Sequence, residues 1–165
     1  MKKSLFEGED DDFENAYDYA LRLLEYSPQT EKILADKMKI KKYPPEIIRR
    51  VCEKLTENSL LKDYEVAGIY ADNLVKIKNL GFNSIVVKLK QKGIGSEMAS
   101  QIAKEALENN GGEEALLRKY IEKNFDIPAD IEDRTRLEKM KQKLSRRGFG
   151  LSRINEAIKN FTDLA

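Results

Sequence analysis

Apolar residues recur along this chain in three stripes that share one spacing. Each stripe places apolar or small residues at positions i, i+3, i+4 and i+7, the pattern that lines one side of an α-helix. The stripes consist of Ile48, Val51, Cys52 and Leu55; of Ala99, Ile102, Ala103 and Ala106; and of Ile154, Ala157, Ile158 and Phe161. We therefore predict three amphipathic helices that occupy equivalent places in a repeated unit.

The segment before each stripe repeats as well. An apolar anchor, several basic residues, a turn and a second apolar residue follow one another three times, with anchors at Met38, Leu89 and Leu144. The anchors lie 51 and then 55 residues apart. Further upstream, the apolar positions of residues 16–24 match those of residues 67–75, again at an offset of 51 residues. Periods of this size are typical of stacked supersecondary units.

These patterns predict an all-α fold. We expect a tandem array of three three-helix units that forms an elongated, curved molecule. The units are expected at residues 15–61, 62–110 and 111–165. Residues 1–14 carry six acidic and two basic side chains and no helical stripe, so we expect an acidic, flexible N-terminal arm there.

Two of the three turns are expected to need an unusual backbone. Gly93 and Gly148 fall where the second helix of a unit should end, and a helix C-terminus there often needs a residue with positive φ. Lys42 takes this place in the first unit, where the Pro44–Pro45 pair is expected to stop the helix instead.

The residues after the turns have two expected roles. The next apolar residue should fill the angle between the second and third helices, at Tyr43, Ile94 and Phe149. Ser96 and Ser152 are expected to be N-caps of the third helix in their units.

Composition agrees with a helical protein. Charged residues make up 36% of the chain, which has only 9 glycines and 4 prolines. No apolar run approaches the roughly 20 residues of a membrane span, and no signal peptide is visible. The single cysteine, Cys52, cannot form an internal disulfide, so we expect a protein of the reducing cytoplasm.

The net charge of +1 conceals an uneven distribution. Outside residues 1–14 the chain holds 28 basic and 23 acidic residues. Basic residues cluster on or just after the second helix of each unit, which favours a repeated surface for a polyanion or an acidic protein. The alternative is an ordinary solvated helix face. The clusters comprise Lys37, Lys39, Lys41 and Lys42; Lys88, Lys90 and Lys92; and Lys139, Lys141, Lys143, Arg146 and Arg147.

Catalytic chemistry finds little support in the sequence. The chain has no histidine, the commonest general base and metal ligand, and no glycine-rich phosphate loop. Cys52 lies on an apolar stripe and is expected to be a buried hydrophobe rather than a nucleophile. We therefore expect a binding protein without enzymatic activity, cofactor or metal.

With these features the chain resembles a known family, the RecX proteins that regulate the bacterial recombinase RecA. The resemblance runs from about Ala16 to Phe161 and departs from the family's pattern in two places. Lys42 stands where the family usually has glycine, and Lys76 and Lys78 stand where it favours arginine. The segments that carry the resemblance are Ala20–Leu24, Leu60–Ala67, Gly81–Ile85, Lys88–Ile94 and Arg146–Ile154.

The resemblance implies a monomeric regulator that binds RecA filaments on single-stranded DNA. Such a protein would inhibit recombinase, ATPase and co-protease activity. A set of basic residues is expected to contact acidic surfaces of RecA or the DNA of the filament. Two alternatives remain: a nucleic-acid-binding helical repeat that acts without RecA, and a helical adaptor whose lysines serve only solubility. The expected contact residues are Lys88, Lys90, Lys92, Lys141, Lys143, Arg146 and Arg147.

Overall fold

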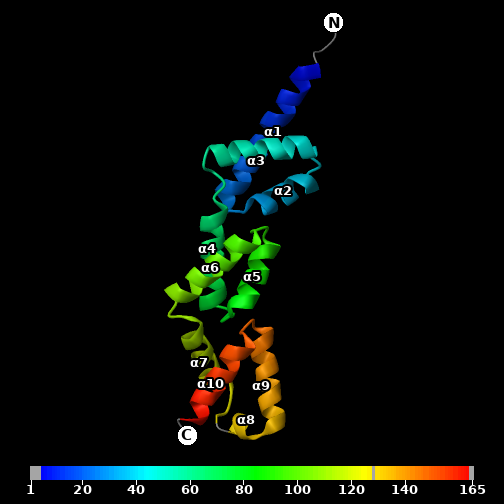
Figure 1. Ribbon diagram of the computed structural model, residues 1–165. Helices are drawn as coiled ribbons and strands as arrows, with labels where there is room; N and C mark the ends of the chain where they lie inside the picture. Colours follow the sequence, from blue (N-terminus) through cyan, green and yellow to red (C-terminus); the bar gives the residue numbers. More distant parts are fainter. Residues whose placement is uncertain (1–4, 128, 164–165) are drawn as a thin grey trace. The chain divides into compact units, whose positions relative to one another are not determined.

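The computed structural model describes the backbone of residues 5–127 and 129–163, with side chains from residue 11 onward. Every regular element in this part of the chain is a helix (Figure 1). The all-α prediction is confirmed, and the helices are consistent with three-helix units. The helices are α1 (Leu5–Tyr26), α2 (Glu31–Ile40), α3 (Pro45–Glu57), α4 (Asp63–Lys76), α5 (Phe82–Gln91), α6 (Ser96–Asn109), α7 (Glu113–Asn124), α8 (Ala129–Glu132), α9 (Arg134–Arg146) and α10 (Leu151–Thr162).

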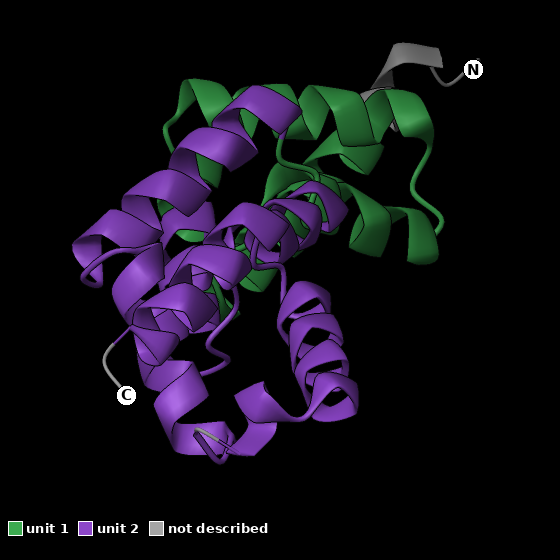
Figure 2. Ribbon diagram, turned by 60° about the horizontal axis from the view of Figure 1, so that its bottom comes forward, with its two compact units in different colours: residues 1–66, 92–94 green, residues 67–91, 95–165 purple. Residues whose placement is uncertain are grey.

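The helices form two compact units (Figure 2). Unit 1 consists of Met1–Val66 with Lys92–Ile94, and unit 2 consists of Ala67–Gln91 with Gly95–Ala165. The repeat boundaries expected at residues 15–61, 62–110 and 111–165 stay a prediction. The mobility expected for residues 1–14 also stays a prediction. Helix α1 begins within this range, and the side chains of residues 1–10 lie outside the described residues.

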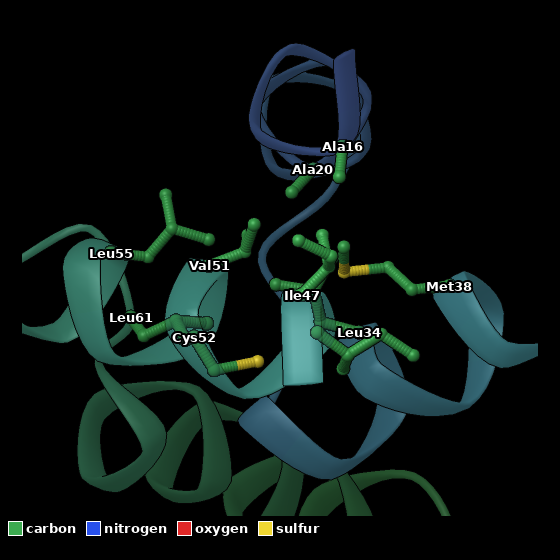
Figure 3. Packing of buried hydrophobic residues seen from close by; sticks show 10 residues of the cluster. Ala16, Ala20, Leu34, Met38, Ile47, Val51, Cys52, Leu55 and Leu61 are labelled. Atoms are coloured by element: carbon green, nitrogen blue, oxygen red, sulfur yellow. The ribbon is translucent and has the colours of Figure 1, made fainter. Parts of the chain in front are cut away.

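The core of unit 1 forms where α1 meets α2 and α3 (Figure 3). Ala16 and Ala20 are fully buried on the inner side of α1, and their small side chains let this helix approach closely. They face Met38, Val51 and Leu55, which are also fully buried. The predicted stripe of α3 thus lies in the core. In unit 2 the corresponding stripe of α10 packs with α7 and α9.

The glycine turns have the predicted backbone. Gly93 and Gly148 have φ values of 92° and 91°, and Lys42 has a φ of 67°. The prediction that prolines replace this geometry in the first turn is therefore wrong, because Lys42 adopts it as well. Ile94 and Phe149, the residues that follow the two glycines, are buried as expected.

In each unit a glycine turn contacts the start of a helix, through a side-chain donor in unit 1 and a main-chain donor in unit 2. In unit 1 the Thr30 hydroxyl, just before α2, donates to the carbonyl of Lys92 over 2.7 Å. In unit 2 the N–H of Gly81, just before α5, donates to the carbonyl of Arg147 over 2.9 Å. A Cβ on the following glycine would clash in both places, with Lys32 at Gly93 and with the backbone of Ser84 at Gly148.

Close contact explains why the first turn differs in residue type. Lys42 is exposed, so its Cβ needs only the positive φ, which costs an L-residue about 1–2 kcal/mol. At Gly93 and Gly148 the space for a Cβ is also missing, so glycine meets two requirements at once.

The predicted serine N-caps are wrong. The N-cap residues of α6 and α10 are Gly95 and Gly150, and neither has a side chain to form a capping bond. Ser96 is the first residue of α6, and Ser152 is the second residue of α10. These helices therefore start directly after the glycines.

Candidate partner-binding surface

The basic residues expected to bind a partner lie on two helices and in the turns that follow them. Lys88 and Lys90 belong to α5, and Lys92 lies in the following turn within unit 1. Lys141, Lys143 and Arg146 belong to α9 of unit 2, and Arg147 is its C-cap residue.

Helical geometry separates the lysines of α5. Residues two apart in a helix point in nearly opposite directions. Lys88 is half-buried beside the core face defined by Ile85 and Leu89, whereas Lys90 is exposed. The structure therefore does not bring Lys88 and Lys90 together on one surface.

The same geometry regroups the basic residues of α9. Lys139, Lys143 and Arg146 follow the i, i+4, i+7 spacing and are all exposed, so they form one face, here named the α9 ridge. Lys141 lies apart from it, is half-buried, and has its Nζ 3.8 Å from the Glu138 carboxylate. Lys139 was missing from the expected contact set, although helical spacing alone identifies it as part of the ridge.

Arg147 is occupied by contacts within unit 2. Its Nη1 donates to the carbonyls of Lys78 and Asn79, over 2.5 and 3.5 Å. Its guanidinium carbon lies 4.3 Å from the centre of the Tyr120 ring, within the range of a cation–π interaction. These contacts make Arg147 a structural residue of unit 2.

An aromatic pair links Arg147 to the α9 ridge. Tyr120 and Phe125 contact each other edge to face, with ring centres 6.4 Å apart. The Nζ of Lys143 lies 5.0 Å from the centre of the Phe125 ring. Lys143 is therefore held in place while its ammonium stays exposed, which lowers the entropy that a partner contact would cost.

Cys52 has the properties of a buried structural residue. Burial raises the pKa of the Cys52 thiol to about 11, and the nearby Glu31 and Asp63 carboxylates act in the same direction. Such a thiol stays protonated and is a poor nucleophile at neutral pH. Within the described ranges no group of His, Cys, Asp and Glu side chains could hold a metal ion. None of the described helices meets the length and hydropathy needed to cross a bilayer.

Comparison with known proteins points to one family. A sequence model described as "RecX, first three-helix domain" matches residues 16–55. A regulatory protein RecX of Finegoldia magna is 35% identical over 98 residues, which are 59% of this chain and 48% of that protein. A second, from Bacillus velezensis, is 28% identical over 90% of this chain and 56% of that protein. The chain thus spans about half the length of these curated relatives.

Solved structures agree over nearly the whole chain. The crystal structure of RecX from Lactobacillus salivarius matches with a TM-score of 0.77 and 26% identity, over 94% of this chain and 99% of that one. Another crystal structure, of a regulatory protein RecX, matches with a TM-score of 0.79 and 28% identity, over 93% of this chain and 74% of that one. Fold and sequence agree, and in both the chain is similar to RecX regulatory proteins.

Proposed function

We propose that this protein binds RecA filaments assembled on single-stranded DNA and inhibits their recombinase, ATPase and co-protease activities. The observation that carries the proposal is the agreement in fold and sequence with RecX regulatory proteins over more than nine-tenths of the chain. The proposal gives the protein a place in the control of DNA recombination, DNA repair and the SOS response, inside the cytoplasm. It acts as a regulator without catalytic activity of its own.

The arrangement of charge supports a partner with a repeating acidic surface. Tandem helical units with basic residues at similar positions supply several weak contacts in one chain. When contacts are joined covalently, each one raises the effective concentration of the next, so a filament of identical protomers is bound more tightly than a single protomer. All three cations of the α9 ridge are exposed, and two of them, Lys143 and Arg146, belong to the expected contact set.

ATP hydrolysis by RecA on single-stranded DNA tests this proposal. Increasing amounts of the protein should reduce the hydrolysis rate well before it equals RecA in concentration, because one molecule acts on a polymer. Binding to RecA alone, to bare single-stranded DNA and to the assembled filament should be compared in parallel. Tightest binding to the filament is expected. Equal binding to bare DNA and filament would favour the alternative of a nucleic-acid-binding module that acts without RecA.

A further inference from the structure

Unit 1 contains a surface hollow of about 580 Å³ that the proposed function does not use. One wall comes from α1 and the other from the turn after α2. A volume of this size is within the range of small-ligand sites. The lining residues are Asn15, Tyr19, Arg22, Leu23, Lys41 and Tyr43.

Two tyrosines give the hollow an aromatic wall. The rings of Tyr19 and Tyr43 have their centres 5.7 Å apart and are tilted by 41°. Both side chains are half-buried, and the Tyr43 hydroxyl lies 3.4 Å from the Asn15 carbonyl, to which it donates. Partial burial restrains both rings and the hydrogen bond restrains Tyr43, so stacking of a flat ring on this wall costs less side-chain entropy than on free tyrosines.

Two cations lie at the same hollow. Arg22 and Lys41 are both exposed, and no ion pair to a carboxylate is found for either within the described ranges. The Nε of Arg22 donates to the backbone carbonyl of Asp18 over 3.3 Å, which leaves its terminal nitrogens available. The Nζ of Lys41 lies 5.9 Å from the centre of the Tyr19 ring.

Cations beside aromatic rings that a base can reach are the combination that single-stranded nucleic acids require, and here the two rings are half-buried. The phosphates of these nucleic acids need positive charge, and their unpaired bases stack on aromatic side chains. A carboxylate of an acidic protein would use the two cations and leave the aromatic wall without a partner. The chemistry of the hollow thus favours a nucleotide over an acidic side chain.

We infer that this hollow binds one nucleotide of a single-stranded nucleic acid. Its phosphate lies between Arg22 and Lys41, and its base stacks on the wall formed by Tyr19 and Tyr43. The inference rests on the proposed function only in that a RecA filament presents single-stranded DNA. It is tested without RecA, so the two can fail separately.

Direct binding to labelled oligonucleotides tests the base and phosphate contacts apart. A 15-residue oligo(dT) and an abasic oligonucleotide of the same length carry the same phosphates, but only the first has bases. Arg22→Gln and Lys41→Gln should weaken binding to both and should each lower the slope of log affinity against log salt by about 0.7. Tyr19→Leu should weaken binding to oligo(dT) about 5-fold or more and leave the abasic oligonucleotide unaffected.

Two matched variants serve as controls. Tyr19→Phe keeps the ring and should retain the affinity of the parent protein. Lys54→Gln removes one charge from an exposed position on α3 of the same unit, outside the hollow, and should bind both oligonucleotides as the parent does. Helical circular dichroism of each variant establishes that the fold is intact.

Three results would overturn the inference. The first is a Tyr19→Leu variant that loses affinity equally for both oligonucleotides, together with a loss of affinity in Tyr19→Phe. The second is unchanged oligonucleotide affinity in Arg22→Gln and Lys41→Gln. The third is a parent protein that binds poly-glutamate through these residues but not oligo(dT), which would assign the hollow to an acidic protein. If the parent protein inhibits RecA without binding oligo(dT), this inference fails and the proposed function stands. If the parent binds oligo(dT) through the hollow but does not inhibit RecA, the inference stands and the proposed function fails.

Discussion

The guanidinium of Arg147 lies over the ring of Tyr120, 4.3 Å from its centre, while its Nη1 donates to the carbonyls of Lys78 and Asn79. One side chain thus connects the end of α9 to α7 and to the loop before α5. Sequence alone assigns Arg147 to a basic cluster, whereas its contacts give this half-buried residue a structural role in unit 2. This difference leads to the first prediction.

Arg147→Ala should destabilise the protein by about 1–2 kcal/mol, because it removes a cation–π contact and a charged hydrogen-bond donor. Urea unfolding measures the effect. Arg146→Ala is the matched control. Arg146 is exposed on the α9 ridge, so its replacement should change the free energy of unfolding by less than about 0.5 kcal/mol. Equal destabilisation by the two substitutions would contradict a structural role for Arg147.

The glycine turns predict an order of substitution effects. Gly148→Ala should cost about 2–4 kcal/mol, since it adds a strained φ and a clash with the backbone of Ser84. Lys42→Gly should change the free energy of unfolding by less than about 0.5 kcal/mol, because relief of a positive φ offsets the added freedom of the unfolded chain. Denaturant titration of both variants gives the comparison. A small change in the free energy of unfolding for Gly148→Ala would mean that the turn moves away from α5.

The α9 ridge should contribute to RecA inhibition. Reversing all three charges (Lys139→Glu, Lys143→Glu, Arg146→Glu) is expected to raise the half-inhibitory concentration in the RecA ATPase assay roughly 10-fold or more, through lost attraction and added repulsion. The matched control reverses three exposed lysines elsewhere in unit 2: Lys104→Glu, Lys123→Glu and Lys159→Glu. Net charge changes equally in the two variants, so similar losses would show that only total charge matters.

The three central lysines, Lys88, Lys90 and Lys92, should also contribute to RecA inhibition, but unequally. Reversing their charges is expected to weaken inhibition while leaving helicity intact, as electrostatic contacts require. Because Lys88 and Lys90 point to different sides of α5, single reversals should have unequal effects, with the larger one at the exposed Lys90. Unchanged inhibition in the triple variant would exclude this helix from the contact surface.

Cys52 should be almost inert in the folded protein. With a pKa of about 11 instead of 9.0, its thiolate fraction at pH 8 is roughly 100-fold lower, and its alkylation by iodoacetamide should slow accordingly. The raised pKa also links stability to pH. The contribution of the protonated thiol is complete below pH 9 and is lost as the pH rises towards 11.

Comparison with Cys52→Ala isolates that contribution. The difference in the free energy of unfolding between parent and variant should change between pH 9 and 11 and stay constant below pH 9. A rate of alkylation in the native protein equal to that in urea would show that the thiol is accessible.

Local patterns predict the fold well, because helical spacing depends on neighbouring residues. The stripe that contains Val51 and Leu55 lies in the core, and the backbones of Gly93 and Gly148 are as expected. The N-caps at Ser96 and Ser152 were wrong by one or two residues, since a glycine can start a helix without a capping side chain.

The candidate sites were less predictable, because they depend on tertiary contacts. Counting charges along the chain groups Lys88 with Lys90, although the turn of the helix separates them. The hollow in unit 1 joins Tyr19 to Tyr43 across 24 positions of sequence, and aromatic residues at repeat positions indicate only a core. The short helix α8 carries no apolar stripe that could have indicated it.

The contact made by the turn at Gly148 is largely between main-chain atoms, whereas the turn at Gly93 contacts the side chains of Thr30 and Lys32. Nearly any side chain is compatible with a carbonyl that receives a hydrogen bond from an N–H group. Side chains on the surface near Gly148 can therefore be replaced without loss of this contact. In unit 2 the framework is thus separable from the side chains that it displays.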